Sequence, residues 1–420
     1  MIPASTSAFE KTRANQAKRL KPLLDALSRR SFFQDRLPPA DSHRDVWERF
    51  ESIEPMTKSD LITPSGIAAV CDLPATRYVR WHQTSGTTGQ PIVVRDTAED
   101  WRWWMRCWDV ILDAAEIGVG DVALMAFSFG PFIGFWSAAD ALVQRGVMMI
   151  PGGGLSSRRR AELIVSQKVS VIFTTPTYAM RLASVAAEHS IDLAAAAVRR
   201  VVVAGEPGGS IPAVRAAIET AYGASVIDHA GGSEVGPWGY ATAGGDGLHV
   251  IESEYIAEVM DFTGQTPRPI PRDNPDRRTG ELVLTPLGRL GCPVMRYRTG
   301  DIVCPGVAGV DDHLFFQGGV IGRADDMIVI RGVNVFPSSI DAIVRECSDR
   351  EYRVTVSRRG ELDRLSIELG DEPEVAGRLR DRLRDRLAMT VAVQSVDVDA
   401  LPTFEAKARR WIDRRGETAG

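Results

Sequence analysis

The stretch Thr84-Ser85-Gly86-Thr87-Thr88-Gly89-Gln90-Pro91 precedes the strand-like run Ile92-Val93-Val94. Glycines let a backbone approach an anion and turn its N–H groups toward it, and the hydroxyls of Ser and Thr supply further donors. The Walker pattern Gly-x-x-x-x-Gly-Lys-Ser/Thr is absent, because Gln90 follows the last glycine. A Gly/Thr/Ser cluster taken alone is more often a polar surface turn. The glycines and hydroxyls have the chemistry of a loop that grips phosphate, so the rest of the chain can be asked whether it supplies the other parts of a nucleotide site.

Length and composition indicate a globular protein of two or more domains. The 420 residues exceed what one ordinary hydrophobic core organises. Apolar and charged fractions of 44% and 25% are typical of folded chains. The 50 basic and 55 acidic residues give a net charge of −5, and no basic stripe indicates nucleic acid as a partner.

Neither the cysteines nor the apolar runs indicate a zinc site or a membrane anchor. Five cysteines are scattered without zinc-ligand spacing, so reduced, mostly structural thiols are expected at Cys71, Cys107, Cys292, Cys304 and Cys347. An uncharged segment at 122–139 is broken by Gly130-Pro131, and each half is too short to span a bilayer. The polar first residues do not resemble a signal peptide, so a cytoplasmic enzyme is predicted.

Strand-like and helical runs alternate from residue 122 to residue 227. Short apolar runs separated by helices are typical of an α/β fold with a mostly parallel sheet and helices on its faces. The expected strands are 122–127, 147–150, 169–174, 201–203 and 225–227, and the expected helices are 135–145, 159–168, 177–188 and 211–222. Such sheets bind ligands in the loops that follow their strands. The loops of this kind are 152–154, 175–176, 204–207 and 230–234.

Other segments frame this sheet. A helix is expected at 98–115, where Trp101, Trp104 and Trp108 recur on one face and are interpreted as core. Short strands and turns are expected between 252 and 303, with a mobile surface loop at 264–279. The last hundred residues read as a separate small α+β unit whose boundary lies near 323–326. We therefore expect domains at 1–323 and 324–420.

Further motifs follow the first stretch in a recognisable order. They are Gly205-Glu206-Pro207, Gly231-Gly232-Ser233-Glu234, Arg296-Tyr297-Arg298-Thr299-Gly300-Asp301, a run from Gly322-Arg323-Ala324-Asp325 to residue 337, and Leu401-Pro402-Thr403-Phe404-Glu405-Ala406-Lys407. Together they resemble the adenylate-forming superfamily of acyl-CoA synthetases, adenylation domains and luciferases, and most of all its phenylacetate–coenzyme A ligase branch. The resemblance covers residues 32–413. It implies a large N-terminal domain with sheets flanked by helices and a small mobile C-terminal domain.

The resemblance implies a two-step ligase. A carboxylate attacks the α-phosphate of ATP to give an acyl-AMP and pyrophosphate, and coenzyme A then displaces AMP. The first step joins two anions, so it needs charge neutralisation and in-line placement more than a covalent catalyst. The expected cofactors are ATP, Mg²⁺ and coenzyme A, and the expected partner is a small carboxylic acid, with no nucleic acid and no membrane. A homodimer is compatible with the sequence.

By resemblance, the first stretch holds the β- and γ-phosphates. Its phosphate-binding residues are Thr84, Ser85, Gly86, Thr87, Thr88 and Gly89. Glu234 would serve catalysis by helping to hold Mg²⁺, a hard cation that prefers oxygen ligands. An exposed carboxylate at a strand end is the alternative interpretation of Glu234, and its Gly-Gly-Ser-Glu context favours the metal.

The AMP moiety is assigned to two groups of residues. Asp301 is expected to accept from the ribose hydroxyls, since a carboxylate can accept two such hydrogen bonds at once. Arg323 is a second candidate, for the ribose or for a phosphate. The residues expected around the adenine are Gly205, Glu206, Pro207, Asp228, His229 and Ala230.

Positions in the C-terminal domain carry implied roles. Lys407 is the expected catalytic lysine, whose cation offsets charge that develops as carboxylate meets α-phosphate. An ordinary exposed charge is the default for a lone lysine, and the Leu-Pro-x-x-Glu-x-Lys-Ala context argues against it. Asp325 resembles the hinge about which the small domain rotates between the half-reactions. Arg331 and Gly332 are expected near the coenzyme A tunnel.

An aromatic or compact apolar acid is expected in an apolar pocket. The lining residues are Phe129, Phe132, Phe135, Tyr178, Ala230 and Gly231. Core packing is an equal alternative for any single phenylalanine here. Three positions depart from the family pattern, because Ala230 replaces an aromatic residue, Ala406 a glycine and Phe135 a small residue.

Two other functions stay open on the sequence. An adenylating ligase could pass the acyl group to an amine or to a carrier protein. A nucleotide-binding protein that has lost turnover is the non-enzymatic alternative. The joint presence of Glu234, Asp301 and Lys407 argues against the last of these.

Overall fold

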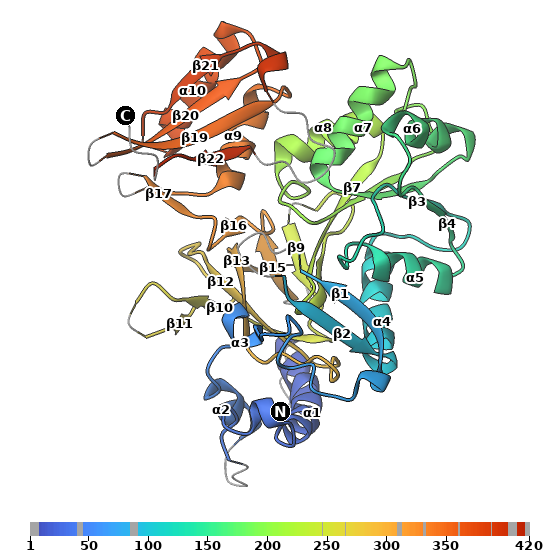
Figure 1. Ribbon diagram of the computed structural model, residues 1–420, viewed down its shortest axis with the longest axis vertical. Coiled ribbons are helices and arrows are strands. Elements are labelled where there is room, and N and C mark those ends of the chain that lie inside the picture. Colours follow the sequence, from blue (N-terminus) through green and yellow to red (C-terminus); the bar gives the residue numbers. More distant parts are fainter. Residues whose placement is uncertain are drawn as a thin grey trace, which may run out of the picture.

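The computed structural model describes residues 8–39, 45–84, 91–245, 247–264, 266–308, 313–330, 333–359, 362–387, 389–401 and 410–415. A large lobe holds the chain up to β16, and a smaller C-terminal unit holds the strands and helices that follow (Figure 1). The N-terminal helices lie at the end of the large lobe that is remote from this unit. The predicted α/β architecture is confirmed.

Within the described residues, one half of a nine-stranded sheet is parallel, as the alternating pattern predicts. Its strands in spatial order are β4 (Met148–Pro151), β3 (Val122–Met125), β5 (Val171–Thr174), β6 (Arg200–Val203) and β7 (Ser225–Gly232). Helices α4 (Ala98–Ala114) and α5 (Trp136–Gln144) pack on one face, and α6 (Ser157–Ser166), α7 (Pro176–Glu188) and α8 (Pro212–Tyr222) pack on the other. The strands are mainly apolar because helices lie on both faces of the sheet.

Strand β7 is longer than the predicted 225–227 because it changes partner along its length. It pairs in parallel with β6 as far as Asp228 and antiparallel with β8 (Gly236–Tyr240) from His229 onward. A bulge lies between Ala230 and Gly231. The sheet continues with β9 (Gly247–Val250), β15 (His313–Gln317) and β14 (Pro305–Ala308), all antiparallel. The change of partner places the Gly-Gly-Ser-Glu motif where β7 turns into β8.

A second sheet, which is antiparallel, carries the Arg-Tyr-Arg-Thr-Gly-Asp motif. Its strands in order are β11 (Arg268–Pro269), β10 (Tyr255–Asp261), β12 (Gly280–Pro286), β13 (Tyr297–Val303) and β16 (Gly322–Arg323). Its last pairing sets Asp301 opposite Arg323. The segment expected as a mobile loop contains β11 and an anchor, because the buried Asn274 donates to the carbonyl oxygen of Pro305 at 3.1 Å.

The N-terminal elements brace the large lobe. They are α1 (Ala8–Leu27), η1 (Ser31–Phe33), α2 (Val46–Glu51), α3 (Lys58–Leu61), η2 (Ala75–Arg77) and the hairpin of β1 (Tyr78–Gln83) and β2 (Val93–Thr97). Helix α3 begins at a capping box formed by Thr57 and Asp60. The three predicted core tryptophans of α4 are buried, which confirms their interpretation.

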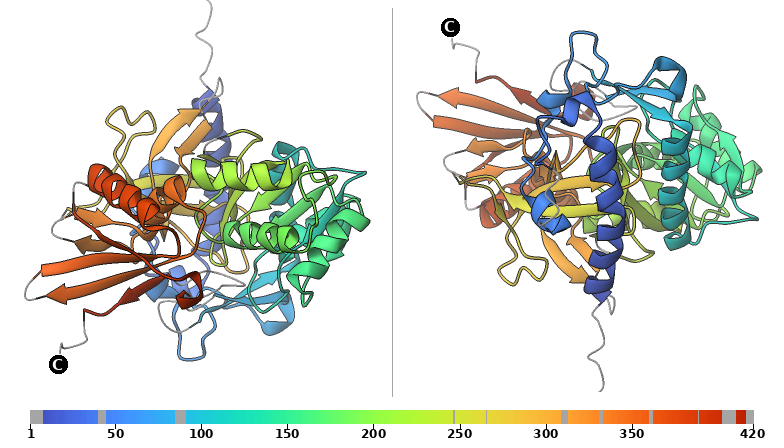
Figure 2. Two further views of the ribbon diagram at one scale, coloured as in Figure 1. Left: turned by 90° about the horizontal axis from the view of Figure 1, so that it is seen from above. Right: turned by 90° about the horizontal axis from the view of Figure 1, so that it is seen from below.

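The C-terminal unit has its own apolar core, separate from those of the large lobe. Its elements are β17 (Ile328–Ile330), β18 (Val333–Val335), α9 (Pro337–Cys347), β19 (Tyr352–Arg359), β20 (Leu362–Leu369), α10 (Pro373–Leu387), β21 (Ala392–Ser395), η3 (Val398–Ala400) and β22 (Trp411–Asp413). Strands β19 and β20 form the core hairpin, which β21 and β22 extend in parallel. Helix α9 contacts α8, and the view from above shows the C-terminal helices beside the large lobe (Figure 2).

No helix in the described part of the chain is long and apolar enough to cross a membrane. The uncharged segment 122–139 consists of β3, a loop that contains Gly130 and Gly134, and the start of α5, as predicted. Its apolar character follows from burial, because the last three residues of β3 are fully covered.

Candidate active site

Two hydrogen bonds join Thr84 and Ile92, which lie on either side of the predicted phosphate loop. The N–H of Thr84 donates to Ile92 O at 2.9 Å, and the N–H of Ile92 donates to Thr84 Oγ1 at 3.0 Å. The predicted residues Ser85, Gly86, Thr87, Thr88 and Gly89 lie outside the described residues. Because Thr84 Oγ1 is the acceptor in the second of these hydrogen bonds, the hydroxyl hydrogen of Thr84 can still donate to a phosphate.

Glu234 lies half-buried in the turn between β7 and β8. Burial and the nearby Glu234 carboxylate raise the pKa of the Tyr297 hydroxyl, so this phenol is protonated and can donate to the carboxylate. Within the described residues, no three acidic, His or Cys side chains gather as a metal cage. A single half-buried carboxylate still fits Mg²⁺, because proteins often hold that ion with one or two carboxylates together with substrate phosphates.

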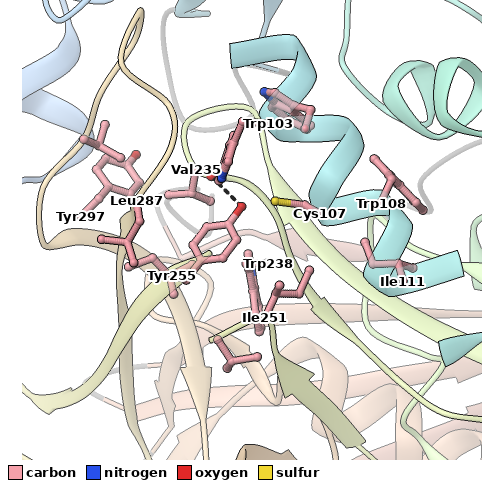
Figure 3. Packing of buried hydrophobic residues seen from close by; sticks show 14 of the residues in the cluster. Trp103, Cys107, Trp108, Ile111, Val235, Trp238, Ile251, Tyr255, Leu287 and Tyr297 are labelled. Atoms are coloured by element: carbon pink, nitrogen blue, oxygen red, sulfur yellow. Dashed lines mark hydrogen bonds between the residues drawn. The ribbon is translucent and has the colours of Figure 1, made fainter. Parts of the chain in front are cut away.

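Packing beneath this turn fixes its backbone. Tyr255 of β10 donates its hydroxyl to Val235 O at 3.0 Å, and α4 brings Trp103 against the same place (Figure 3). Gly236 follows with a φ of 90°. A Cβ there would lie 2.8 Å from Tyr255 Oη and 2.9 Å from the Trp103 ring. Both the backbone conformation and the space therefore require glycine at the end of the turn.

A buried arginine holds the two carbonyl groups of the turn. Arg289 Nη1 donates to Ser233 O at 2.7 Å and to Glu234 O at 2.8 Å. The same guanidinium makes two bonds to Asp96, one of 2.7 Å from Nε and one of 3.1 Å from Nη2. The two side chains are 0% and 1% exposed. Because Asp96 lies in β2, the strand that follows the predicted phosphate loop, this ion pair connects β2 to the Glu234 turn.

Neighbouring groups complete the surroundings of the Arg289–Asp96 pair. Trp104 Nε1 donates to Asp96 Oδ1 at 3.2 Å, and Asp100 accepts the N–H groups of Leu290 and Gly291 at 2.7 and 3.0 Å. Burial raises the pKa of Asp96, and the adjacent guanidinium opposes that rise. Sequence inspection missed the pair because its members are 193 residues apart and lie outside the motifs. The one local signal is an arginine between glycine and leucine in a largely apolar run.

Asp301, Arg323 and Asp325 form an ionic cluster where the second sheet meets the C-terminal unit. Arg323 Nη1 donates to Asp301 Oδ1 at 3.1 Å, and its Nε donates to Asp325 Oδ1 at 2.9 Å. Burial raises the pKa of Asp301 to about 6, although the Arg323 charge acts to lower it. The side chains of these residues are 19%, 42% and 39% exposed, in the order named. The structure therefore brings the two predicted ribose residues together with the predicted hinge residue.

Side chains of the predicted adenine segment are engaged within the protein. Gly205 has a φ of 91°, and Glu206 Oε1 accepts from the N–H of Thr177 at 2.8 Å in the first turn of α7. Asp228 accepts a hydrogen bond from Ser210 Oγ, and burial raises the pKa of Asp228 to about 6. Gly205 and Pro207 are exposed. This segment therefore offers a nucleotide its backbone groups more than its side-chain groups.

His229 points away from Asp228, since successive side chains of a strand alternate between faces. Its ring centre lies 4.5 Å from that of Trp108, and its Nδ1 is 2.8 Å from Gly239 O. Burial lowers the pKa of His229 to about 4, so the ring is neutral at pH 7. The imidazole belongs to the core, which leaves the backbone of His229 for the predicted adenine contact. The next residue, Ala230, packs on the same core, and Gly231 is exposed.

Four aromatic side chains after β3 form one group, which we call the aromatic cluster. Its members are Phe127, Phe129, Phe135 and Trp136. Ring centres are 4.8 Å apart for Phe127 and Phe129, 5.2 Å for Phe127 and Phe135, and 4.6 Å for Phe129 and Trp136. Phe135 is 5% exposed and continues into the core, whereas Phe129 and Trp136 are half-buried. The cluster therefore presents ring surface at the margin of the core.

Two further predicted pocket residues, Phe132 and Tyr178, are placed differently. Phe132 is 47% exposed. Tyr178 lies on the other face of the sheet, where its ring centre is 4.9 Å from the guanidinium carbon of Arg160. Its helix begins in a predicted ligand loop, but its side chain turns toward α6. The structure groups Phe129 with Phe135 and does not group Tyr178 with them.

The predicted residues Lys407, Arg331 and Gly332 lie outside the described residues. The chain on either side of 402–409 is held by the C-terminal unit. Leu401 is buried, and Arg410 donates to the two carboxylate oxygens of Glu351 at 2.5 and 3.1 Å.

Known proteins match almost the whole length of this chain. Residues 332–415 match the family model described as AMP-binding enzyme C-terminal domain. A phenylacetate–coenzyme A ligase of Escherichia coli strain K12 is 31% identical, over 98% of this chain and 97% of the relative. A phenylacetate–coenzyme A ligase of Pseudomonas putida is 29% identical, over 98% of this chain and 96% of the relative.

Solved structures of one ligase in two states match this chain to different degrees. A 2-hydroxyisobutyryl-CoA ligase in the postadenylation state, in complex with 2-HIB-AMP, gives a TM-score of 0.86 at 25% identity, over 99% of this chain and 94% of that one. The same ligase in the thioesterification state, with 2-HIB-AMP and CoA, gives 0.69 at 26% identity, over 99% and 91%. Since the protein compared is the same, this chain matches the postadenylation arrangement of that ligase more closely than its thioesterification arrangement.

Proposed function

Because this chain belongs to the adenylate-forming superfamily, in its phenylacetate–coenzyme A ligase branch, we propose how its residues divide the work of that chemistry. The protein is an AMP-forming acid–thiol ligase. It activates a carboxylic acid with ATP to an acyl-AMP, and it then transfers the acyl group to coenzyme A. The 31% identity to a phenylacetate–coenzyme A ligase over 98% of the chain carries this conclusion.

We propose that the acid is aromatic or compact and apolar. The curated relatives are named for phenylacetate, and the 2-hydroxyisobutyryl-CoA ligase holds 2-HIB-AMP, a small branched acyl group. The aromatic cluster supports this choice, because Phe129 and Trp136 offer half-buried ring surface that an apolar acid can cover. Phe135 fills the inner end of the cluster, which favours a short acid over a long acyl chain.

On the nucleotide side, we propose that Glu234 helps to hold Mg²⁺ and that Asp301 accepts from the ribose hydroxyls. Bound Mg²⁺ would neutralise phosphate charge and so ease the approach of a carboxylate. Arg289 is proposed as a positioning residue, because it binds the two carbonyl groups of the Glu234 turn. It touches no substrate in this role, and it acts by setting where the Glu234 carboxylate stands relative to the phosphate loop.

Lys407 is proposed as the catalytic lysine of the first half-reaction. Its motif supports the role, and the flanking residues are anchored to the C-terminal unit. We further propose that the unit turns about Asp325 to admit coenzyme A near Arg331 and Gly332, with domains at 1–323 and 324–420. The higher score against the postadenylation state than against the thioesterification state supports such a movement. The proposed place of action is the cytoplasm.

A panel of acids tests the substrate class and the acceptor together. Pyrophosphate release is measured with phenylacetate, benzoate, 2-hydroxyisobutyrate and a long-chain fatty acid, with and without coenzyme A. We expect release with the short acids and thioester formation when coenzyme A is present. Preference for the long-chain acid contradicts the pocket, and acid-dependent release without thioester indicates an amine or a carrier protein as the acceptor.

Half-reaction assays test Lys407. Lys407→Ala is expected to lose adenylation by two or more orders of magnitude, while thioester formation from supplied acyl-AMP persists. Lys21→Ala, which removes an exposed lysine of α1, is the matched control and should leave both half-reactions unchanged. Equal loss of the two half-reactions in Lys407→Ala contradicts the assigned role.

A further inference from the structure

Two cysteines from distant parts of the chain meet inside the large lobe. Cys71 lies between α3 and β1, Cys292 lies between β12 and β13, and 221 residues separate them. Their Sγ atoms are 2.6 Å apart. Cys292 is 1% exposed, and Cys71 keeps an exposed fraction of 8%. The pair therefore lies just below the surface, with Cys71 on the solvent side.

Separate contacts on both sides of the sulfur atoms hold the two segments in this register. Arg30 donates to Val70 O at 2.8 Å and to Leu290 O at 2.6 Å. Tyr78 donates its hydroxyl to Gly291 O at 3.0 Å and accepts the N–H of Leu73 at 3.2 Å. Each residue thus joins the backbone next to Cys71 to the backbone next to Cys292. The meeting of the two thiols is built into the fold and is not a chance contact between loops.

The two thiols differ in their readiness to ionise. The hydrogen bond with Cys292 lowers the pKa of the Cys71 thiol, and the Arg289 charge contributes in the same direction. Burial raises the pKa of the Cys292 thiol. Cys71 is consequently the better nucleophile, since the thiolate is the reactive form. Cys107, by comparison, is fully buried, and burial raises the pKa of its thiol.

We propose that Cys71 and Cys292 are a redox-responsive dithiol that hydrogen peroxide converts into an intramolecular disulfide. The Cys71 thiolate attacks one peroxide oxygen, the O–O bond breaks, and the departing hydroxide takes up a proton to leave as water. The Cys292 sulfur then attacks the resulting sulfenic acid, the S–O bond breaks, and a second water leaves with the Cys292 proton. Two thiols are oxidised by two electrons, and one hydrogen peroxide is reduced to two waters. A dithiol reductant reverses the change.

The bond would tie together the two segments that flank the nucleotide site. Cys71 belongs to the segment that leads into β1 and the phosphate loop, and Cys292 follows Arg289, which holds the Glu234 turn. Closing a loop of more than two hundred residues restricts the unfolded chain strongly, so the oxidised protein is expected to be the more stable form.

The experiment compares the full-length protein after treatment with hydrogen peroxide and after treatment with a phosphine reductant. After unfolding, the reduced protein should show five reactive thiols and the oxidised protein three, since Cys71 and Cys292 are two of the five. Non-reducing peptide mass spectrometry should find the Cys71 and Cys292 peptides linked, and the melting temperature should rise by several degrees. Five thiols after oxidation, or a linked pair other than these two, overturns the proposal.

Three variants sharpen this test. Cys71→Ser and Cys292→Ser should each lose both the linked peptide and the rise in melting temperature. Cys107→Ser, which removes a buried cysteine of α4, is the matched control and should keep both. The same rise in Cys71→Ser contradicts the proposal. If a serine variant fails to fold, the thiol count and the peptide map of the unchanged protein still decide.

Discussion

Two arginine–carboxylate groups flank the proposed nucleotide site, and they differ chiefly in burial. Arg289 and Asp96 are 0% and 1% exposed, and Arg289 also binds two backbone carbonyl groups. Arg323 is 42% exposed and is shared between Asp301 and Asp325. A buried pair has no water to replace a lost partner, whereas a half-exposed arginine can exchange carboxylates at small cost. The first arrangement suits a fixed support, and the second suits the hinge proposed at Asp325 and the ribose contact proposed for Asp301.

The largest difference between the two groups is expected when Arg289 is removed. Arg289→Met leaves the Asp96 carboxylate buried without its partner, which should lower the free energy of unfolding by about 3–5 kcal/mol. Urea denaturation measures that loss, and pyrophosphate release should fall at the same time. Arg102→Met, which removes an exposed arginine of α4, is the control and should change neither quantity.

A double variant separates support of the fold from positioning of Glu234. Asp96→Asn combined with Arg289→Met removes the lone charge and should recover part of the stability. Adenylation should remain slow in the double variant, with a raised requirement for Mg²⁺, because nothing then holds the carbonyl groups of the turn. Recovery of the normal rate and Mg²⁺ requirement along with the stability contradicts positioning by Arg289.

Asp301→Ala tests the half-exposed group that Arg323 forms with Asp301 and Asp325. Loss of a carboxylate that accepts from ribose should weaken ATP binding about 10- to 100-fold, since a hydrogen bond to a charged group contributes about 1.5–3 kcal/mol. Calorimetric titration with ATP measures the affinity. Asp276→Ala, at an exposed position of the large lobe, is the matched control. Unchanged affinity in Asp301→Ala removes this residue from the ribose site.

The pH dependence of ATP binding sharpens the same assignment. The pKa of Asp301 is about 6 in the folded protein, so protonation removes an acceptor as the pH falls below 6. ATP affinity should fall by about tenfold between pH 7 and pH 5, if the ionised form alone accepts both hydroxyl bonds. Because this pKa lies above the usual value of 3.8, ionisation of Asp301 also costs folding stability as the pH rises from about 4 to 6. The Asp301→Asn variant should bind ATP weakly, and its ATP affinity should depend less on pH. Because burial also raises the pKa of Asp228 to about 6, this variant distinguishes the contribution of Asp301 from that of Asp228.

The smallest effect is expected at the junction. Asp325→Ala removes a half-exposed partner of Arg323, so stability should change by about 0–1 kcal/mol. Adenylation should stay within about twofold of normal, while thioester formation should slow several-fold because the movement about the hinge is altered. Rapid-quench measurement of each half-reaction checks this. Asp363→Ala, in the hairpin of the C-terminal unit, is the control, and equal slowing of the two half-reactions contradicts a hinge at Asp325.

Local pattern predicted the elements of the large lobe and the order of its motifs. The alternation from β3 to β7 was readable because each strand and each covering helix is apolar at its own period. Asp301, Arg323 and Asp325 were found through their motifs, and the fold gathers them as an ionic cluster. Periodicity did not predict that β7 exchanges one partner for another at Asp228, because a continuous strand looks the same in sequence on either side of such a change.

What escaped prediction depends on contacts between distant segments. The arginine in an apolar run at 289 does not indicate that Asp96 is its partner, and nothing local to Cys71 or Cys292 indicates that their sulfur atoms meet. The side chain of Tyr178 follows a predicted ligand loop, yet the rotation of its helix turns the ring toward α6. Which face a side chain adopts after a loop depends on packing that the sequence does not display.

The aromatic cluster has a practical consequence for following the first encounter with substrate. Trp136 stands half-buried at its outer edge, with its ring tilted 73° against Phe129 and its indole N–H bonded to Gly130 O at 3.0 Å. An acid bound at the proposed pocket, against Phe129, would displace water from this indole and shift its emission. Among the nine tryptophans of the chain, Trp136 therefore serves as an intrinsic fluorophore for ligand entry, and a Trp136→Phe protein supplies the spectral baseline.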